Sequence, residues 1–483
     1  MTTFVCEICY VYQYEPAHGD KGTNIPPGTH PKDFPKDWEC PFCGSSADRL
    51  MPEEAEAPIK TEDLPHFAEY LSKWTRHRDD MEKDMETIHS MAIHAESVFS
   101  SMRTKIGTPS WNSLLLLGAQ MATLPLNEDE DVNLKTIIGP NAEKPLELSM
   151  PVYVSHMSFG ALSKEAKLSL ARGSAKVGTA IGSGEGGVLE EELEASGNYI
   201  YEYVPNRYSY SAENMAKVQA IEVKIGQSTK PGMGGHLPRE KVTAEVAALR
   251  GFPEKTDIIS PARFPGIQGV DGFRDLVDEL RSVGKGVPIG LKIAAGHIED
   301  DLDVIMETGA DYVTIDGRPG GTASTLNYVK DSTSVPTIVA LDRARRHLDD
   351  AGSDLSLVIT GGLRSSADVA KALALGADAV ALGTACLMAI GCQQYRLCNT
   401  GKCPTGVTTQ DPELRLRLVA DYSTKRLANF LNTMASELKD FARLTGRRDV
   451  HQLSRDDLVC SDLDLSQSVF IRHMDGRYHY LKD

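Results

Sequence analysis

The amino-acid sequence predicts an α/β protein built on a (β/α)8 TIM barrel, with a small N-terminal metal domain and helical flanking segments. From about residue 151, short apolar runs alternate with helical segments, and Gly-rich or polar groups follow the runs. Two pairs of cysteines precede this region. Eight strand–helix units in about 235 residues are what such a barrel requires. The candidate strands are 151–156, 178–182, 220–226, 257–260, 288–294, 310–316, 356–361 and 377–383.

Length and charge limit the possible classes of function. A chain of 483 residues predicts two to four folding units. Lys and Arg number 51 against 68 Asp and Glu, a net charge of −17, so nucleic acid and anionic membrane are not expected partners. The N-terminus has neither a basic start nor an apolar signal core, so we expect a cytoplasmic protein.

Changes in composition divide the chain into five expected segments. Residues 51–63 are acidic, contain two prolines and lack apolar periodicity, which is typical of a linker. Apolar residues then recur at helical spacing from Leu64. The expected segments are a four-cysteine metal domain at 1–50, the linker at 51–63, a helical lead-in at 64–150, the barrel at 151–410 and a C-terminal helical extension at 411–483.

The nine cysteines form two clusters, and in a chain with no export signal this indicates metal or redox chemistry rather than disulfides. The first cluster has two C-x2-C pairs thirty residues apart, a spacing that places four thiolates around one zinc or iron ion. The second has x5 and x4 spacing. Cys386 and Cys460 are interpreted as buried small hydrophobes. The clusters are Cys6, Cys9, Cys40 and Cys43, then Cys392, Cys398 and Cys403.

Glycine turns after the last two predicted strands indicate a phosphate site. Gly361-Gly362 follows the seventh strand, and Gly383-Thr384 follows the eighth. Loops at these places in a barrel frequently bind phosphate through backbone amides. The alternative is that these are ordinary turn glycines. The stretch 182–187 satisfies G-x-G-x-x-G, but no dinucleotide-binding sheet surrounds it, so we interpret it as a tight loop that presents Glu185 to a ligand.

Two lysines lie in apolar runs near strand ends. Lys292 and Lys224 are each flanked by branched apolar residues. Since a lysine is almost never fully buried without a charged partner, each needs a carboxylate or an anionic ligand. Lys292 would stabilise the negative charge of a reduced flavin ring. The alternative for either lysine is a structural ion pair across the barrel mouth.

Residues 4–50 resemble rubredoxin. The resemblance rests on Tyr12, Tyr14, Phe34 and the closing run Asp37–Gly44, which reads DWECPFCG. It implies iron rather than zinc at the four cysteines. Tyr10 stands where rubredoxins have glycine after the second cysteine, which puts the amide–sulfur hydrogen bonds of the first pair in question.

From about Gly107 to Leu458 the chain resembles the FMN-binding synthase domain of glutamate synthase, in its short archaeal-type form. Many independent motifs carry this resemblance over roughly 350 residues, so chance does not explain it. The motifs are Pro125–Glu130, Met157–Ser163, Gly184–Gly187, Lys224–Gln227, Lys230–Gly232, Gly234–Pro238, Gly320–Thr322 and Cys392–Gln410.

The resemblance implies two cofactors in the barrel and assigns residues to them. Cys392, Cys398 and Cys403 match the three ligands of a 3Fe-4S cluster. The implied FMN contacts are Met157, Ser158, Lys292, Gly320, Gly321, Gly361, Gly362, Gly383 and Thr384. The implied substrate groups are Lys224, Gln227 and Lys230, which suit a dicarboxylate, with Glu185 near the reacting centre.

The implied activity is that of an oxidoreductase acting on CH–NH2 donors. An imine formed from 2-oxoglutarate and ammonia would be reduced to L-glutamate, with electrons entering through the rubredoxin-like and 3Fe-4S centres. The expected partners are a protein electron donor or a separate reductase or glutaminase subunit, and we expect a homo- or hetero-oligomer. The large enzymes begin with a glutaminase domain, whereas this sequence begins with the rubredoxin-like segment.

Two loops depart from the family pattern and keep other functions open. Residues 263–266 and 317–319 differ from the family pattern in two loops that face the substrate in the family. This puts the identity of the substrate as 2-oxoglutarate in question. One alternative is an electron-transfer flavoprotein without amino-acid chemistry. Another is transfer of the N-methylglutamate synthase type, which needs no external electrons. The cysteine triplet argues for electron flow through the site.

Overall fold

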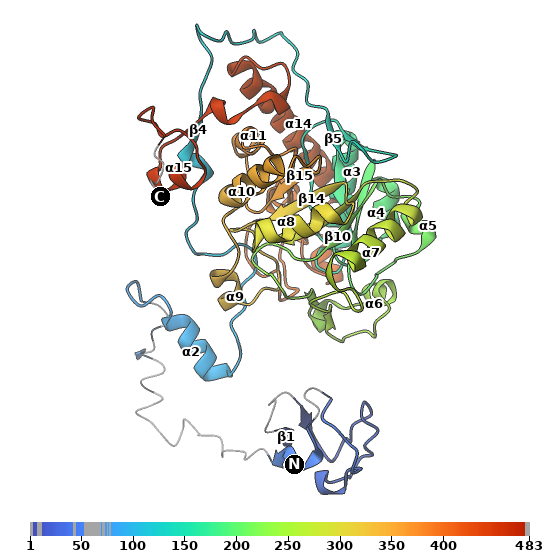
Figure 1. Cartoon of the computed structure of the whole chain (residues 1–483). Coiled ribbons are helices and arrows are strands. Elements are labelled where there is room, and N and C mark those ends of the chain that lie inside the picture. Colours follow the sequence, from blue (N-terminus) through green and yellow to red (C-terminus); the bar gives the residue numbers. More distant parts are fainter. Residues whose placement is uncertain are drawn as a thin grey trace. The chain divides into compact units, whose positions relative to one another are not determined.

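The chain folds into two units, residues 1–92 and 93–483. The structure is a computed structural model that describes residues 3–6, 12–41, 45–52, 69, 73–74, 76 and 79–478. Figure 1 shows the elements of both units. Over the residues just given, no helix combines the length and apolar character needed to cross a membrane.

The N-terminal unit is built on a small antiparallel sheet in the order β2-β1-β3. Its core is aromatic: the rings of Tyr14 and Phe34 meet edge to face at 4.8 Å, and those of Phe34 and Trp38 at 5.1 Å. Large aromatic side chains compensate for the small core that so short a domain can bury. The strands are β1 (Phe4–Cys6), β2 (Gln13–Tyr14) and β3 (Leu50–Pro52), and the helix α2 (Met85–His94) follows.

The second unit is a closed barrel of eight parallel strands, which confirms the predicted fold class. Each strand pairs with the next barrel strand along the chain, and the last strand, β16, closes the ring on the first, β7. The strands are buried on both faces and so are rich in Val, Ile and Leu. They are β7 (Val152–Val154), β8 (Ala180–Gly182), β9 (Asn198–Tyr203), β10 (Ala220–Lys224), β13 (Ile289–Ala294), β14 (Tyr312–Asp316), β15 (Ser356–Thr360) and β16 (Ala379–Leu382).

One of the eight predicted strands is wrong. The run 257–260 contains β12 (Ile258–Ile259), which pairs antiparallel with β11 (His236–Leu237) outside the barrel. The third barrel strand is β9, whose sequence NYIYEY does not read as an apolar run. Its polar Glu202 is nevertheless buried, because the barrel interior supplies a cationic partner for the carboxylate.

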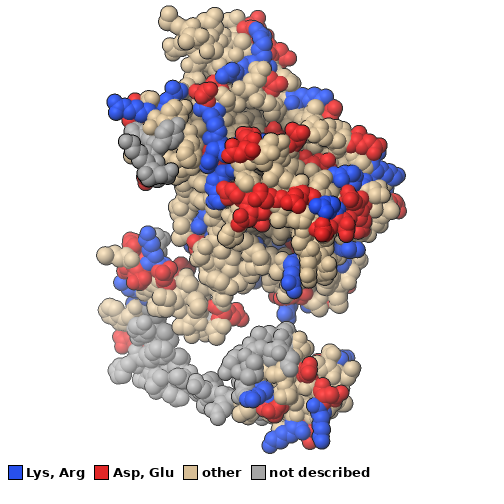
Figure 2. All heavy atoms as spheres, viewed as in Figure 1, with Lys and Arg blue, Asp and Glu red and all other residues tan. Residues whose placement is uncertain are grey.

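Helices surround the barrel (Figure 1). Side chains cap the N-termini of several of these helices. Ser163 accepts a hydrogen bond from the Ala166 amide at the start of α3, and Ser365 and Asp368 form a capping box on α11. In Figure 2 acidic side chains gather over α8. The helices are α3 (Lys164–Lys176), α4 (Glu190–Ala195), α5 (Ala212–Met215), α6 (Ala244–Arg250), α7 (Gly269–Val283), α8 (Ile298–Glu307), α9 (Asn327–Ser332), α10 (Thr337–Asp350), α11 (Ser366–Ala374) and α12 (Thr384–Ile390).

The flanking segments contain more strands than the sequence predicts. Segment 64–150 is expected to be helical, yet within its described part α2 is joined by three strands. Two of them form a hairpin that packs against the buried side chains of the barrel strands, including Tyr153 and Tyr312. These strands are β4 (Leu114–Leu116), β5 (Thr136–Ile138) and β6 (Leu146–Leu148).

The C-terminal segment is mainly helical, as expected, with one strand as an exception. β17 (Leu458–Cys460) pairs antiparallel with β4, so the chain after the barrel returns to the segment before it. The helices are α13 (Pro412–Arg415), α14 (Ala420–Leu444) and α15 (Leu463–Ser468). The long α14 lies against α3, where Gly173 permits close approach of Leu427. The limits of the five expected segments stay predictions.

Candidate active site at the carboxyl end of the barrel

The thirteen barrel residues assigned from the sequence to cofactor or substrate line one cavity. It lies at the carboxyl ends of the strands, where this fold places its active sites. The structure therefore brings the predicted residues together, while the role of each stays a prediction. These residues are Met157, Ser158, Glu185, Lys224, Gln227, Lys230, Lys292, Gly320, Gly321, Gly361, Gly362, Gly383 and Thr384.

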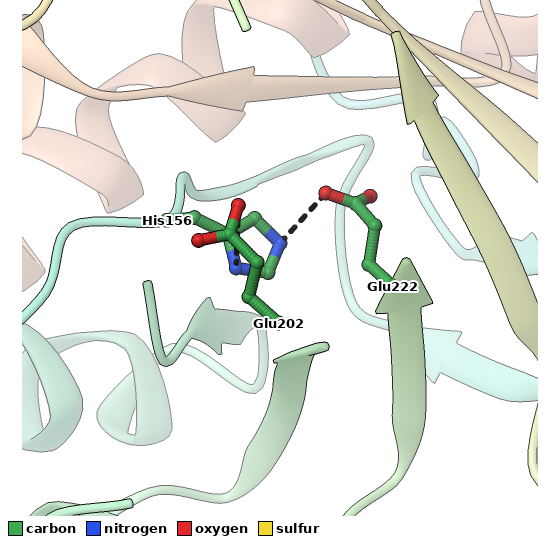
Figure 3. A group of neighbouring side chains, drawn as sticks. All are labelled: His156, Glu202 and Glu222. Carbon is green, nitrogen blue, oxygen red and sulfur yellow. Dashed lines mark ion pairs between the residues drawn. The ribbon is translucent and has the colours of Figure 1, made fainter. Parts of the chain in front are cut away.

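A buried ionic cluster lies beneath this cavity. The Lys292 ammonium is 2.9 Å from Glu202 Oε1 and 3.8 Å from Glu222 Oε1. His156 lies between the two carboxylates, with Nε2 3.0 Å from Glu222 and Nδ1 4.0 Å from Glu202 (Figure 3). Thr314 Oγ1 donates to Glu222 at 2.5 Å. The histidine and two carboxylates could converge on a metal ion, but Lys292 already supplies a cation there.

The protonation of this cluster follows from its charges. Burial alone would raise the pKa of Glu202, but Lys292, His156 and Lys224 outweigh it and lower the pKa to about 2. Burial opposes the charged form of Lys292, yet Glu202 and Glu222 raise its pKa above the ordinary value. Lys292 is therefore a fixed positive charge in the lining of the cavity.

A second ion pair lies on the wall of the cavity. The carboxylate of Glu185 contacts the ammonium of Lys224 and accepts from the hydroxyl of Ser260. Burial would raise the pKa of Glu185, but Lys224 and Ser260 lower it. Gly235 makes room for this carboxylate, because a Cβ there would overlap with it. Glu185 is thus held as an anion by direct contact with Lys224.

Lys230 differs from Lys224 and Lys292, two other lysines that line the cavity. It is 4% exposed and lines the cavity, and no ion pair or hydrogen bond of its side chain occurs within the described ranges 12–41, 45–52 and 79–478. Burial, with a smaller contribution from Lys224, lowers its pKa to about 8. Glu185 acts on it only from beyond ion-pair distance, so the ammonium stays available in an enclosed site and is suited to a carboxylate of a ligand.

The glycine turns and two arginines fit a phosphate. Gly361 and Gly362 have φ of +114° and +91°, and Cβ atoms there would overlap with the loop that follows β14. Arg103 and Arg364 both line the cavity and are close enough to repel each other, which with burial lowers the pKa of Arg364. Close backbone approach and paired cations are the features that an FMN phosphate requires, so the residues fit this cofactor.

The three cysteines of the second cluster line a neighbouring cavity, and Cys398 lines both that cavity and the main one. Burial would raise the pKa of Cys403, but hydrogen bonds from Thr405 and Thr408 lower it to about 7. Gln394 donates to the Cys392 sulfur at 3.2 Å through its side chain. In a three-iron cluster each cysteine binds a different iron, so three thiolates around one cavity fit such a group.

A segment preceding the barrel closes both cavities. Residues 98–106, here called the strap, cross from the loop after β14 to the cysteine loop. The Met102 amide donates to Thr322 O at 3.0 Å, and the Ser101 hydroxyl donates to Asn399 at 2.9 Å. Met102 is buried with φ of +76°, a conformation rare for a bulky residue, and lines both cavities.

The metal site of the N-terminal unit is described only in part. Cys6 and Cys40 are buried in the small aromatic core. The Cys6 sulfur lies 3.2 Å from the Ser45 hydroxyl. Cys9 and Cys43 fall outside the described residues, so the four-cysteine set stays a prediction of the sequence.

Several residues of the site are not assigned from the sequence. Glu202, Glu222 and His156 surround Lys292, and the signal for them is the lysine itself, since a buried cation demands a carboxylate. Lys241 is 1% exposed and donates to the carbonyls of Ala161 and Cys398, at 2.7 and 3.1 Å. No sequence pattern marks Lys241, because its partners are backbone atoms of distant loops.

Comparison with known proteins shows which family this chain belongs to. Residues 82–448 match the model described as the conserved region in glutamate synthase, and residues 3–50 match the rubredoxin model. A glutamate synthase large subunit-like protein of Rhizobium meliloti is 39% identical over 382 residues, covering 75% of this chain and 86% of the relative.

Two further relatives and one solved structure complete the comparison. Archaeal-type glutamate synthase (NADPH) of Thermotoga maritima is 40% identical over 67% of this chain and 64% of its own length. The archaeal enzyme of Methanocaldococcus jannaschii is 40% identical over 66% and 63%. This chain thus spans slightly less than two thirds of either relative. A mandelate oxidase variant with an FMN adduct superposes with a TM-score of 0.46 at 17% identity, over 70% of this chain and 86% of that one. By the match over residues 82–448, the chain belongs to the glutamate synthase family, and it carries an N-terminal rubredoxin domain.

Proposed function

We propose that the chain catalyses the reductive formation of L-glutamate from 2-oxoglutarate and ammonia. The reaction consumes two electrons and two protons and releases one water, so it requires a reductant. Family membership and the composition of the cavity support this proposal. The observation that carries it is Lys230, a buried lysine without a protein counter-ion in the described residues, beside the Glu185–Lys224 pair.

The lysines of the cavity bind and orient the substrate in this proposal. Lys230 and Lys224 neutralise the two carboxylates of 2-oxoglutarate, and Gln227 donates an amide hydrogen bond. Glu185, kept ionised by Lys224, accepts a proton as ammonia condenses with the keto group. Lys292 holds a positive charge under the ring of the cofactor.

Two groups supply the redox chemistry when bound. The residues of the main cavity would hold FMN, which would supply a hydride, and Cys392, Cys398 and Cys403 would hold a 3Fe-4S cluster, which would supply single electrons. The four cysteines of the rubredoxin domain would hold iron, zinc being the alternative, for electron entry from a protein donor or a separate reductase subunit. A glutaminase subunit is the alternative source of ammonia.

The experiment is an anaerobic half-reaction on the full chain. The purified protein is reduced with just-sufficient dithionite, and the flavin absorbance is followed while 2-oxoglutarate and ammonium are added separately and together. Reoxidation that needs both additions, with glutamate appearing, is the expected result. A flavin that stays reduced would overturn the proposal and favour an electron-transfer flavoprotein. Glutamate or N-methylglutamate formed without any reductant would favour the transfer reaction.

A further inference from the structure

Lys167 is a buried lysine that the proposed function does not use. It belongs to the first turn of α3 and is 0% exposed, as is its ion-pair partner Glu192 on α4, whose Oε1 lies 2.7 Å from the ammonium. Lys167 does not line the main cavity. A fully buried ion pair is often no more stabilising than apolar side chains of similar size. Stabilisation of the fold therefore does not by itself explain why Lys167 and Glu192 occupy this position.

The Lys167 ammonium joins two loops of the active site. It donates to the carbonyl of Met157 at 2.6 Å and to that of Ser183 at 2.9 Å. Two of its three N–H groups are thus used by carbonyls, while Glu192 lies beside the ammonium as an ion-pair partner. Met157 follows strand β7 and Ser183 follows β8, so a single side chain fixes the chain just beyond two neighbouring strands.

Because the peptide bond is planar, these contacts also fix the direction of two backbone amides. In a trans peptide the N–H of a residue points away from the carbonyl of the residue before it. With their carbonyls on Lys167, the peptides 157–158 and 183–184 direct the Ser158 and Gly184 amides away from the lysine. Neither amide donates a hydrogen bond to an acceptor in the described part of the chain. Met157, Ser158 and Glu185, on the same two loops, line the cavity.

The packing of the two loops explains why both amides stay together. Gly184 has φ of +74°, and a Cβ there would overlap with the Met157–Ser158 peptide. The Ser183 hydroxyl accepts from the Glu202 amide at 2.9 Å, which ties the second loop to strand β9. Tyr199, also on β9, donates to the other oxygen of Glu192 at 3.2 Å. The pair is thus anchored from three elements.

We propose that Lys167, paired with Glu192, is a positioning residue that aims the amide of Ser158, a residue that lines the cavity, at an acceptor atom of the bound cofactor, with the Gly184 peptide packed against it. A lysine suits this task because one ammonium donates to two carbonyls while it lies against a carboxyl group. Burial raises the pKa of that Glu192 carboxyl to about 7, against the opposing effect of Lys167. The assignment of the cofactor rests on the proposed function, but the ordering of the loops does not.

The test removes both members of the pair together. The double variant Lys167→Met/Glu192→Leu replaces both ions by apolar side chains, which costs far less stability than removing one partner. Lys371→Met is the matched control. Lys371 is a buried lysine that donates to the carbonyl of Trp111 at 2.9 Å, outside both cavities.

Two measurements on the full chain test whether Lys167 positions the two loops. In cofactor-free protein, hydrogen exchange should be about tenfold faster at the Leu162 and Ser183 amides, which are bonded to Ser158 O and Ile200 O in the intact loops. The FMN dissociation constant should rise about tenfold, the effect of losing one well-aligned hydrogen bond. Lys371→Met should change neither, even where its unfolding temperature falls as far as that of the double variant.

Each outcome has one meaning. Unchanged exchange at Leu162 and Ser183 would overturn the positioning role, because the loops would then be ordered without the pair. Faster exchange with unchanged FMN affinity would show that the Ser158 amide is not aimed at the cofactor, and would also overturn the proposal. If the wild-type chain binds no FMN, the proposed function fails, while the exchange measurement still shows whether Lys167 orders the loops.

Discussion

The Lys292 ammonium lies 2.9 Å from Glu202 Oε1 inside the barrel, where each residue is no more than 3% exposed. The lysine comes from β13 and the glutamate from β9, two strands that both neighbour β10. The pair therefore crosses the barrel interior above β10, whose own Glu222 is the second carboxylate near the lysine. This arrangement places a permanent cation at the floor of the cavity.

Replacing Lys292 by Met should destabilise the protein strongly. Glu202 and Glu222 would be left as buried carboxylates without their main counter-ion, and removing one partner of a buried pair costs about 3–5 kcal/mol. The free energy of unfolding, measured by urea denaturation of cofactor-free protein, tests this. The double variant Lys292→Met/Glu202→Gln should recover part of the loss. A loss below about 1 kcal/mol in the single variant would contradict a buried, charged Glu202.

The Lys292–Glu202 pair predicts how the free energy of unfolding depends on pH. The pKa of Glu202 is about 2 in the folded chain and 4.5 in its unperturbed state, so the stabilisation is complete above pH 4.5. It should be lost as the pH falls from about 4.5 towards 2, because the unfolded chain binds the proton first. Unfolding free energies of wild type and Glu202→Gln, measured over this range, should converge as the pH falls. Parallel curves would show that Glu202 does not titrate in this way.

Lys230 predicts a pH dependence of substrate binding. Its pKa of about 8 means that the cationic form, which attracts a carboxylate, is lost as the pH rises through 8. The KM for 2-oxoglutarate should therefore increase by about tenfold for each pH unit above 8. Lys230→Arg keeps its charge at high pH, so its KM should stay flat over pH 7–9. An equal rise of KM in wild type and variant would assign the effect to another group.

The close approach of Gly321 to the strap predicts that the position of the strap affects cofactor binding. A Cβ at this position would overlap with the carbonyl of Met102, so Gly321→Ala should displace residues 98–106 from both cavities. Because Arg103 moves with the strap, we expect FMN affinity to fall by about tenfold, the loss of one charge-assisted contact. Gly107→Ala is the control, since a Cβ there meets nothing within 4 Å. Equal affinities in the two variants, measured by flavin fluorescence, would remove the strap from the cofactor site.

Cys398 separates the two redox groups. Cys398→Ser should remove the 3Fe-4S signal in electron paramagnetic resonance and reduce donor-dependent turnover below about 1% of wild type, while FMN stays bound. Cys460→Ser alters a cysteine that is also buried but lies outside both cavities and donates to the carbonyl of Asp462. It should leave both signals unchanged. Full turnover in Cys398→Ser would exclude the cluster from the electron path.

The sequence allows seven of the eight barrel strands to be located, because strands buried on both faces read as apolar runs. The prediction misses β9, because tyrosines and Glu202 stand there in place of aliphatic residues. It wrongly assigns 257–260 to the barrel, because two consecutive isoleucines resemble the apolar run of a buried strand. The lead-in is expected to be helical, whereas β4 and β17 pair across more than 300 residues of sequence. Pairing over such a distance leaves no local pattern.

The sequence by itself determined the family, the barrel and the set of residues that meet at the carboxyl ends of its strands, because motifs and strand order are properties of the linear chain. Only the tertiary structure decided which charges are paired. Lys292 and Lys224 share the same kind of sequence context, yet one contacts Glu202 and the other Glu185, and Lys230 contacts neither. The physical reason is that the protonation and partner of a buried charge depend on what closure of the barrel brings within a few ångströms of it.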